Sequence, residues 1–418
     1  MKQTEIGLIP DDWEVKRLGE ILTIKHGYGF EGDSFSAEDN GFIVVTPGNF
    51  KLNGGFQKPQ ASIFYIGKYP KEFNLKPNDL VIMMTDLSKE SDTLGNPAII
   101  PDDNYQYLHN QRIGLINCNS DNFDKNYLFH LLCSKDYHKA VVSTAAGSTV
   151  KHTSPKRIYT IKLPITQNLQ EQQRIAKALS DVDALISTTE KLIQKKKNIK
   201  QGAMQNLLTG KKRLPGFGPQ TKSPAYKQTE LGSIPEDWEV KSLGELFDMK
   251  AGGDVDKEHF SYCKSSLYKY KIFSNGLENE GIYGYTDLPK YKGNAITITG
   301  RGTVGIAMFR EEDFDAVIRL LVLNSKNDNL TNNSYITEEI NSCISFPNES
   351  TGVPQLTVPQ IRDIVIALPS KEEQTAIANV LSSMDKEIET LNTKLEKYRN
   401  LKTAMMQQLL TGKIRLIK

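Results

Sequence analysis

Two long stretches of the chain place apolar residues at alternating spacings of four and three. In the second stretch the seam consists of Ile377, Leu381, Met384, Ile388, Leu391, Leu395 and Tyr398. The first stretch is looser but keeps the same phase, at Ile175, Leu179, Val182, Ile186 and Ile193. Such a seam is typical of helices that pack side by side in a coiled coil. We therefore expect one long helix over residues 169–209 and another over residues 371–411.

The ends of both stretches carry residues that begin and terminate helices. Each follows a side chain that can cap an N-terminus, with a glutamate three residues later: Asn168 with Glu171, and Ser370 with Glu373. Each ends in Thr-Gly, and glycine suits the left-handed position after a helix; these glycines are Gly210 and Gly412. At ~1.5 Å per residue each helix is roughly 60 Å long. Two such helices most simply bury their stripes against each other, and the alternative is two separate solvent-exposed helices.

The segments around these helices show the pattern of short strands. Runs rich in Val, Ile and Thr are bounded by Gly, Pro and Asn, as in strands joined by tight turns. The clearest runs are residues 42–46, 80–85, 295–299 and 304–309. A helical section at 125–140 is interleaved. Residues 21–167 and 246–367 are therefore expected to form β-rich domains of the α+β class.

An internal repeat divides the chain into two halves. Fourteen of the eighteen residues at 3–20 recur unchanged at 228–245, an offset of 225. The helical stretches recur at a different offset of 202, so the second intervening segment is 23 residues shorter (225 minus 202). Between these constant blocks the similarity nearly vanishes. Trp13 and Trp238 occupy matched positions in the constant blocks and are expected to anchor the two cores.

Composition sets limits on the class of protein. The chain has 418 residues, 38% of them hydrophobic, and a formal net charge of +2. Its longest apolar runs are too short to span a bilayer, and its first residues lack the apolar core of a signal peptide, so a cytoplasmic protein without a membrane partner is expected. A protein that coats DNA backbone on its own is normally far more basic. If DNA is the ligand, partner proteins should supply part of the phosphate contact.

The sequence lacks the motifs of catalytic and metal sites. The cysteines form no CxxC pair, and the histidines show no HExxH or close metal spacing. A phosphate-binding GxxxxGK[ST] and the Asn- or Asp-Pro-Pro-aromatic motif of amino-methyltransferases are absent. Residues 300–305 fit GxGxxG only in part, and a tight hairpin is the expected structure there. The basic run of Lys195, Lys196, Lys197 and Lys200 is either a solvated helix face or a contact with DNA or a partner.

Polar turns of the two variable segments carry side chains suited to base edges and phosphates. Arg pairs with guanine and Asn or Gln with adenine, and Gly lets the backbone approach closely. The candidate DNA-contacting residues in the first half are Lys25, His26, Thr85, Ser88, Lys89, Asn110, Gln111, Arg112, Ser148, Thr149, Lys151 and His152. Those in the second half are Lys250, Ser274, Asn275, Thr299, Arg301, Thr303, Gln355 and Thr357.

The duplicated blocks resemble the specificity subunits of type I restriction–modification systems, and the resemblance covers essentially the whole chain. It rests on Ile9-Pro10-Asp11-Asp12-Trp13-Glu14, on Leu163-Pro164 before Glu171-Gln172 and Ile175-Ala176, and on Leu207-Leu208-Thr209-Gly210, all of which recur in the second half. The resemblance implies two β-rich target-recognition domains, each reading half of a split, asymmetric site in double-stranded DNA. It also implies that a pair of long antiparallel helices separates the two domains.

The same resemblance implies the domain boundaries and the partners. A first recognition domain is expected at 1–167, a central helix at 168–213, a linker at 214–227, a second recognition domain at 228–369 and a C-terminal helix at 370–418. The chain would have no catalytic residues and bind no cofactor or metal. Two methyltransferase subunits would bind S-adenosylmethionine and methylate adenine, and restriction subunits would use ATP and Mg²⁺.

Other classes of function are weighed against this interpretation. A methyltransferase or nuclease in one chain is disfavoured by the missing motifs. A coiled-coil scaffold whose β domains bind protein is a second alternative, and a DNA reader that serves modification only is a third. Neither the DNA target nor the length of its gap follows from the sequence.

Overall fold

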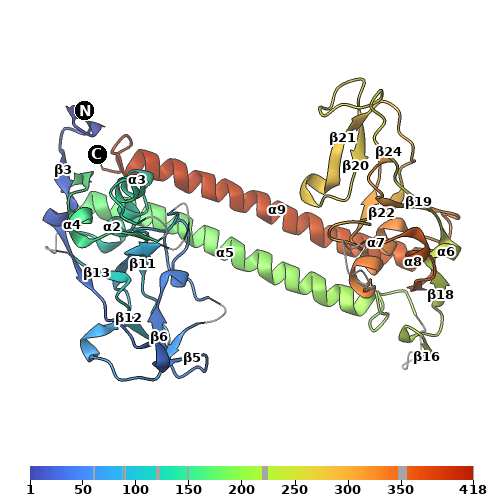
Figure 1. The fold of residues 1–418 in the computed structure, drawn as a ribbon, viewed down its shortest axis with the longest axis horizontal. Helices are drawn as coiled ribbons and strands as arrows, with labels where there is room; N and C mark the ends of the chain where they lie inside the picture. The colour runs from blue at the N-terminus through green and yellow to red at the C-terminus, as the bar shows by residue number, and fades with distance from the viewer. Residues whose placement is uncertain are drawn as a thin grey trace. The chain divides into compact units, whose positions relative to one another are not determined.

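The computed structural model describes residues 1–59, 62–86, 88, 91–118, 123–147, 150–218, 225–346 and 355–417. The chain forms two compact units, of which the first combines two segments that are distant in sequence and the second is continuous. Unit 1 comprises residues 1–190 and 394–418, and unit 2 comprises residues 191–393. The chain therefore begins and ends in the same unit (Figure 1).

Unit 1 contains a four-stranded sheet in the order β11-β9-β13-β4 and a five-stranded sheet in the order β5-β7-β6-β12-β8. Two-stranded pairs join β1 with β2, β3 with β15, and β10 with β14. The strands are β1 (Lys2–Thr4), β2 (Gly7–Ile9), β3 (Trp13–Arg17), β4 (Leu22–His26), β5 (Phe35–Ser36), β6 (Phe42–Val45), β7 (Phe64–Tyr65), β8 (Asn74–Leu75), β9 (Leu80–Met83), β10 (Thr85–Asp86), β11 (Pro97–Ile99), β12 (Gln106–His109), β13 (Ile113–Cys118), β14 (Lys151–His152) and β15 (Lys162–Thr166). The helices are α1 (Leu18–Ile21), α2 (Lys125–Leu132), α3 (Lys135–Ser143) and α4 (Pro155–Tyr159), with 3-10 turns η1 (Gly32–Ser34), η2 (Pro47–Asn49) and η3 (Lys71–Phe73).

Unit 2 contains a four-stranded sheet in the order β19-β25-β22-β23 and a three-stranded sheet in the order β21-β20-β24. Two-stranded pairs join β16 with β17 and β18 with β26. The strands are β16 (Tyr226–Thr229), β17 (Gly232–Pro235), β18 (Glu239–Ser242), β19 (Phe247–Ala251), β20 (Tyr270–Phe273), β21 (Ile282–Thr286), β22 (Ala295–Ile298), β23 (Ala307–Arg310), β24 (Phe314–Ala316), β25 (Leu321–Ser325) and β26 (Val365–Leu368). The helices are α6 (Leu243–Leu246), α7 (Asn333–Cys343) and α8 (Val358–Arg362), with the 3-10 turn η4 (Glu278–Gly281).

The two units share a central arrangement of three strands. In unit 1, β13 lies between β4 and β9, and all neighbours are antiparallel. In unit 2, β25 lies in the same way between β19 and β22. Each unit also has one parallel pair, β6 with β12 and β20 with β24. The α+β class and the internal two-fold repeat predicted from the sequence are confirmed.

Two long helices connect the units. They are α5 (Leu169–Leu207) and α9 (Lys371–Leu409), of 39 residues each. Both end two residues before the expected position, and each is followed by glycine in the left-handed region, with φ +67° at Gly210 and +69° at Gly412. Asn168 caps α5 through its side-chain oxygen, which accepts the N–H of Glu171 at 3.2 Å. Ser370 caps α9 in the same way, at 3.3 Å from the nitrogen of Glu373.

The helices pair antiparallel within each unit, as predicted. In unit 1 the start of α5 lies beside the end of α9, where Lys402 contacts Asp183 at 2.6 Å. In unit 2 the end of α5 lies beside the start of α9, where Lys200 contacts Asp385 at 2.6 Å. The seam residues Ile175, Leu179, Val182, Ile193, Ile377, Leu381 and Leu395 are all buried. Two lysines of the basic run, Lys196 and Lys200, pair with acidic residues of α9, so part of that run stabilises the helix pair.

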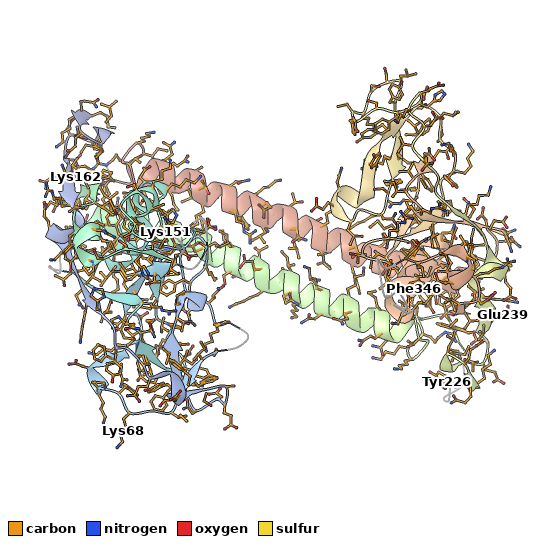
Figure 2. All side chains as sticks on the ribbon, viewed as in Figure 1. Lys68, Lys151, Lys162, Tyr226, Glu239 and Phe346 are labelled. Carbon is orange, nitrogen blue, oxygen red and sulfur yellow. The ribbon has the colours of Figure 1, made fainter. Side chains whose placement is uncertain are left out.

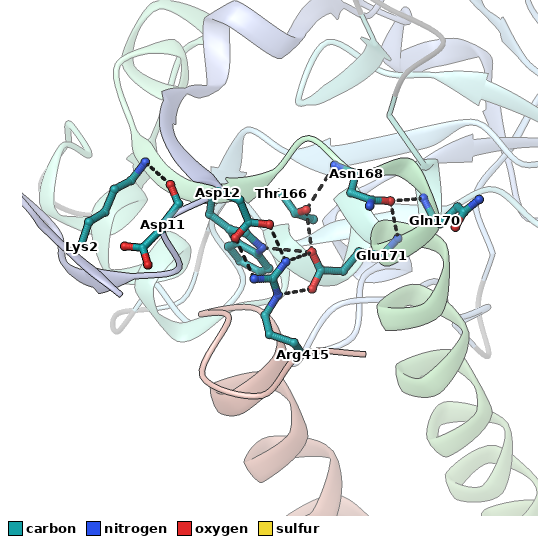
Figure 3. A network of polar contacts seen from close by, with 9 residues as sticks. Lys2, Asp11, Asp12, Thr166, Asn168, Gln170, Glu171 and Arg415 are labelled. Atoms are coloured by element: carbon teal, nitrogen blue, oxygen red, sulfur yellow. Dashed lines mark hydrogen bonds and ion pairs between the residues drawn. The ribbon is translucent and has the colours of Figure 1, made fainter. Parts of the chain in front are cut away.

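A polar joint fastens the C-terminal tail to the first domain within unit 1 (Figure 3). Glu171 is fully buried and accepts hydrogen bonds from Trp13 Nε1 at 3.1 Å and Thr166 Oγ1 at 2.7 Å. Arg415 donates to both oxygens of Glu171, at 2.5 and 2.9 Å, and also contacts Asp12. Glu171, which the sequence suggested as the partner of Asn168 in a capping pair, thus points into the core, because the Trp13 indole and the Arg415 guanidinium donate hydrogen bonds to its carboxylate.

Unit 2 contains the same joint, built from the repeated residues. Arg213 donates to Glu373 at 2.5 and 2.6 Å and to Asp237 at 2.9 Å, while Trp238 Nε1 donates to Glu373 at 3.2 Å. Trp13 and Trp238 are completely buried, which confirms their predicted role as core anchors. Each tryptophan also packs against the glycine after a long helix, where an added Cβ would lie 2.4 Å from a proline ring.

Some local expectations need correction. The helical section at 125–140 is two helices, because the Ser134 side chain caps α3 by accepting the N–H of Tyr137. The strand expected at 304–309 starts only at Ala307, since the preceding residues form the predicted hairpin, with Gly305 N–H bonded to Thr299 O at 2.8 Å. Strand β16 begins inside the linker placed at 214–227. The domain boundaries stay a prediction.

Candidate nucleic-acid interface

One end of the central sheet in unit 1 gathers four segments that are far apart in the sequence. β4 ends at His26, opposite Gly114 of β13, and β9 ends at Met83, opposite Ile113. Residues after β4 and β9 therefore meet residues before β13 at the same end of the sheet. We call residues 26–28, 84–86, 110–112 and 151–153 the first loop cluster.

Main-chain hydrogen bonds hold this cluster together. Gln111 N–H donates to Tyr28 O at 2.9 Å, and Met84 N–H donates to Arg112 O at 2.8 Å. Thr153 N–H donates to Met84 O at 3.0 Å and attaches the fourth segment. Because these bonds use backbone groups, they position the loops without using their side chains.

The corresponding end of unit 2 repeats this arrangement. β19 ends at Ala251 opposite Leu321 of β25, and Leu321 also lies opposite Ile298 at the end of β22. Ile318 N–H donates to Gly253 O at 2.9 Å and Leu356 N–H donates to Gly300 O at 2.9 Å, as their counterparts do in unit 1. We call residues 251–253, 299–303, 317–319 and 355–357 the second loop cluster.

A matched pair of glycines lets the loops approach each sheet end. A Cβ at Gly27 would lie 2.2 Å from the carbonyl oxygen of Asn110, and a Cβ at Gly252 would lie 2.6 Å from that of Ala316. Contacts this short exclude any side chain at either position. Gly27 and Gly252 are related by the same offset of 225 as residues 3–20 and 228–245, so the same backbone packing supports both clusters.

The first loop cluster exposes a varied set of polar side chains. His26, Gln111, Arg112 and His152 are exposed, and Lys151, labelled in Figure 2, is half-buried. Thr85 is buried instead, and its Oγ1 lies 3.0 Å from Nδ1 of His152, so it positions that ring. The structure thus brings together predicted residues from four distant segments. Lys89, Ser148 and Thr149 lie outside the described residues.

Asp86 shows how the framework of this cluster is held. Burial alone would raise the pKa of Asp86, but hydrogen bonds from the N–H groups of Ser88 and Thr93 outweigh it, and the pKa is lowered. The ionised carboxylate therefore fixes the turn. Ser88 stabilises that turn twice. Its N–H donates to Asp86, and its Oγ accepts the N–H of Asp92 at 3.1 Å.

The second loop cluster exposes three of the candidate residues, Arg301, Thr303 and Gln355. Arg301 and Gln355 face each other in an isolated β-bridge, where unit 1 pairs Thr85 with His152. Thr299 is buried, and its Oγ1 closes the hairpin by donating to Thr303 O at 2.5 Å and accepting Ile306 N–H at 2.9 Å.

Several candidate residues have structural roles rather than free polar groups. Thr357 donates to Gln360 Oε1 through both its N–H and its Oγ1, and so caps α8. The Asn275 amide bonds main-chain groups of two loops. Ser274 lies next to it, with its Oγ 3.5 Å from Gly281 O. Lys25 and Lys250 are exposed on β4 and β19, and the Lys25 Nζ lies 4.9 Å from the centre of the Phe73 ring.

Arg319 was missed from the sequence, although it is exposed at the place that Arg112 occupies in unit 1. The signal that could have found it is a third, weaker repeat. Arg112 and Asn117 flank four mostly apolar residues, and Arg319 and Asn324 do the same at an offset of 207. This offset differs from both offsets of the constant blocks, so alignment of those blocks does not reveal it.

Each unit also has a groove beside its end of the helix pair. The groove in unit 1 has a volume of about 1290 Å³ and is lined in part by Met406, Gln407, Thr411 and Lys413. That in unit 2 has a volume of about 650 Å³ and is lined in part by Met204, Gln205, Thr209 and Lys211. These are the same four positions of the repeated helix ends, so both grooves present one constant wall.

Two negative observations concern the part of the chain that the structure describes. Within it, no group of three or more His, Cys, Asp or Glu side chains could hold a metal ion. No helix among those residues combines the length and the apolar character needed to cross a membrane.

Comparison with known proteins gives consistent matches over nearly the whole chain. Residues 10–200 and 235–397 match the family described as type I restriction modification DNA specificity domain. The type I restriction enzyme MjaVIII specificity subunit of Methanocaldococcus jannaschii is 27% identical, with 97% of this chain and 94% of the relative covered. A putative MjaX specificity subunit of the same organism is 29% identical, with 99% and 96% covered. The EcoBI specificity subunit of Escherichia coli is 22% identical, with 97% and 87% covered.

A solved structure has the same fold. The crystal structure of the S subunit of a type I restriction–modification system from M. genitalium superposes with a TM-score of 0.65 at 15% sequence identity. The match covers 98% of this chain and 98% of that one.

Proposed function

The chain belongs to the family of type I restriction–modification DNA specificity proteins, and we propose that its two loop clusters read the two halves of a split DNA site. The observation that carries this proposal is a constant frame with different side chains. Both clusters share the same sheet end, main-chain bonds and close-packed glycine, and Arg112 matches Arg319, yet Thr85, Gln111 and His152 stand in one where Arg301, Ile318 and Gln355 stand in the other. Such a pair of surfaces suits two different half-sites.

The exposed groups have the chemistry of base readout. Guanidinium groups reach O6 and N7 of guanine, and Gln reaches N6 and N7 of adenine, in the major groove of double-stranded DNA. Lys151 within the first cluster and Lys250 next to the second provide the positive charge that phosphates attract. The clusters also lie on loops supported by a rigid sheet, where binding residues commonly occur.

The chain would work with partner subunits. A formal net charge of +2 is small for a protein that binds DNA by itself, because phosphate contacts supply much of the affinity. Two methyltransferase subunits would supply the rest, and the constant wall of the two grooves supports two copies of the same partner. S-adenosylmethionine, and ATP with Mg²⁺ in a full restriction system, would be bound by those partners, and this chain would do no chemistry itself.

The test is methylation by the chain assembled with its cognate methyltransferase subunits, read out as the sequence motif of the methylated sites. We expect a bipartite motif in which Arg112→Ala relaxes one half and Arg301→Ala the other. The exposed Lys257→Ala, outside both clusters, is the matched control and should leave the motif unchanged. A complex that methylates without any bipartite preference would contradict the proposal, as would a substitution in one cluster that changes both halves.

A further inference from the structure

The loop before β25 has an unusual backbone. Ile318 and Arg319 both lie in the left-handed region, with φ of +54° and +63°. This region is unfavourable for side chains with a Cβ and most of all for a β-branched residue such as isoleucine. Ile318 is 40% exposed, so burial of its side chain does not compensate for the strain. Strain of this kind persists where the surrounding structure determines it, and it concentrates at functional sites.

Hydrogen bonds from neighbouring loops impose this conformation. Ile318 N–H donates to Gly253 O at 2.9 Å, and Arg319 N–H donates to Gly252 O at 3.1 Å. The Asn275 side chain adds a third bond, from its Nδ2 to Ile318 O at 2.6 Å. The two residues are thus held on both sides, and the loop presents Arg319 in a fixed backbone geometry.

The same asparagine holds a second arginine loop. Asn275 Oδ1 accepts the N–H of Gly300 at 2.7 Å and the N–H of Arg301 at 3.3 Å. One amide therefore ties the backbones that carry Arg301 and Arg319, although these residues are 18 positions apart in the sequence. Both arginines are exposed, and neither guanidinium bonds to any residue that the structure describes. Two free guanidinium groups on backbones fixed by a common bond are suited to recognise two planar groups at a defined spacing.

We propose that Arg301 and Arg319 each read a guanine in the half-site recognised by unit 2, and that Asn275 is the positioning residue for both. This inference rests on the proposed function and assigns its base contacts. Arg reaches O6 and N7 of guanine with two parallel hydrogen bonds. The amide of Asn275 is engaged by the protein on both its oxygen and its nitrogen, so in this proposal it holds the two loops rather than reading a base.

The first loop cluster differs in a way that sharpens the expectation. Its counterpart of Arg319 is Arg112, but the counterpart of Arg301 is Thr85, which is buried and bonded to His152. The first half-site should therefore contain one arginine-read guanine and the second half-site two.

The experiment uses the chain assembled with its cognate methyltransferase subunits and a DNA library randomised in both half-sites. Arg319→Ala and Arg301→Ala should each reduce the preference for guanine at one position of the second half-site, by about 5- to 150-fold, and leave the first half-site unchanged. Arg112→Ala is the matched control and should act on the first half-site alone.

Two substitutions of Asn275 test its positioning role. Asn275→Asp keeps the acceptor for Gly300 and Arg301 but loses the donor to Ile318, so it should relax only the position read by Arg319. Asn275→Ala loses both and should relax both positions. A merely structural role would make the two variants lower methylation equally on all sequences, without this difference between positions.

The outcomes separate the two levels of the proposal. Arg319→Ala could instead weaken binding equally on all sequences, reduce the slope of log affinity against log salt concentration by about 1, and be rescued by Arg319→Lys. That result would mean that Arg319 contacts a phosphate, and it would overturn the base assignment. If the Arg301→Ala and Arg319→Ala complexes still read a bipartite motif and keep the wild-type preference in the second half-site, this inference alone would be overturned. A wild-type complex without sequence preference would overturn the proposed function.

Discussion

Removal of one arginine from a buried joint should destabilise unit 2 strongly. Glu373 is only 1% exposed, and Arg213 donates to its two oxygens at 2.5 and 2.6 Å. Arg213→Met keeps most of the aliphatic stem but leaves the carboxylate with Trp238 Nε1 as its remaining side-chain partner in the described structure. Breaking a buried pair by removing one partner costs about 3–5 kcal/mol. Asp237 is more than half exposed and regains water, so the loss should lie near the lower value, about 3 kcal/mol.

The two tryptophans make this loss measurable in the full chain, because each unit has one in its joint. In a Trp13→Phe background the fluorescence of Trp238 reports the unfolding of unit 2 alone. We expect the urea midpoint of that transition to fall when Arg213→Met is added. Glu373→Gln added to Arg213→Met should restore part of the stability, because a neutral amide is less costly to bury than an unpaired carboxylate.

The control is an ion pair of similar length on the surface. Arg399 contacts Glu190 at 2.7 Å in unit 1, with both side chains substantially exposed. Arg399→Met, monitored through Trp13 in a Trp238→Phe background, should cost less than about 1 kcal/mol. Equal losses in Arg213→Met and Arg399→Met, each against its own background, would show that burial does not make the ion pair of the joint stronger than a surface pair.

Further predictions concern the helix ends, pH and modularity. Gly210→Ala should lower the free energy of unfolding by about 1 kcal/mol or more, because φ is +67° there and the new Cβ would lie 2.4 Å from Pro235. Gly202→Ala should raise the free energy of unfolding by roughly 0.5–1 kcal/mol, because Gly202 lies inside α5 with open space around it. Thermal unfolding of each variant checks both predictions. Burial raises the pKa of Glu339 from 4.5 to about 8. Between these two pH values the native state keeps a proton that the unfolded state has released, so the free energy of unfolding should fall as the pH rises from 5 to 8. Glu339→Gln should flatten that dependence in denaturation at several pH values, and an unchanged slope would contradict it. Replacing residues 21–163 by the same block of a relative should change one half of the methylated motif, and a change in both halves would argue against independent reading.

Features governed by local signals were predictable from the sequence. The seam spacing and the cap and glycine signals located α5 and α9 to within two residues at their C-terminal ends. The hairpin at 300–305 followed from its glycines, because short glycine-rich turns between strand-like runs have few alternatives. The repeat predicted that the two units share a frame, and their strand pairings confirm it.

Features governed by distant contacts were not predictable in the same way. Asn275 resembled a base-reading residue, but its amide bonds loops that lie 25 and 43 residues away in the sequence. Arg319 gave no turn signal, because its left-handed backbone is imposed by Gly252 and Asn275 rather than by a glycine of its own. The inward turn of Glu171 depends on Arg415, which is 244 residues away.

The most direct test of the central claim is a map of methylated adenines across the genome of cells with and without this gene. We expect that one bipartite, asymmetric motif is methylated when the gene is present and unmethylated when it is deleted, while all other methylated motifs persist. Re-expression of the Arg319→Ala chain should restore methylation at that motif with one guanine of its second half relaxed. An identical methylation map in both strains, with the methyltransferase subunits expressed, would contradict the claim that this chain selects the DNA sites.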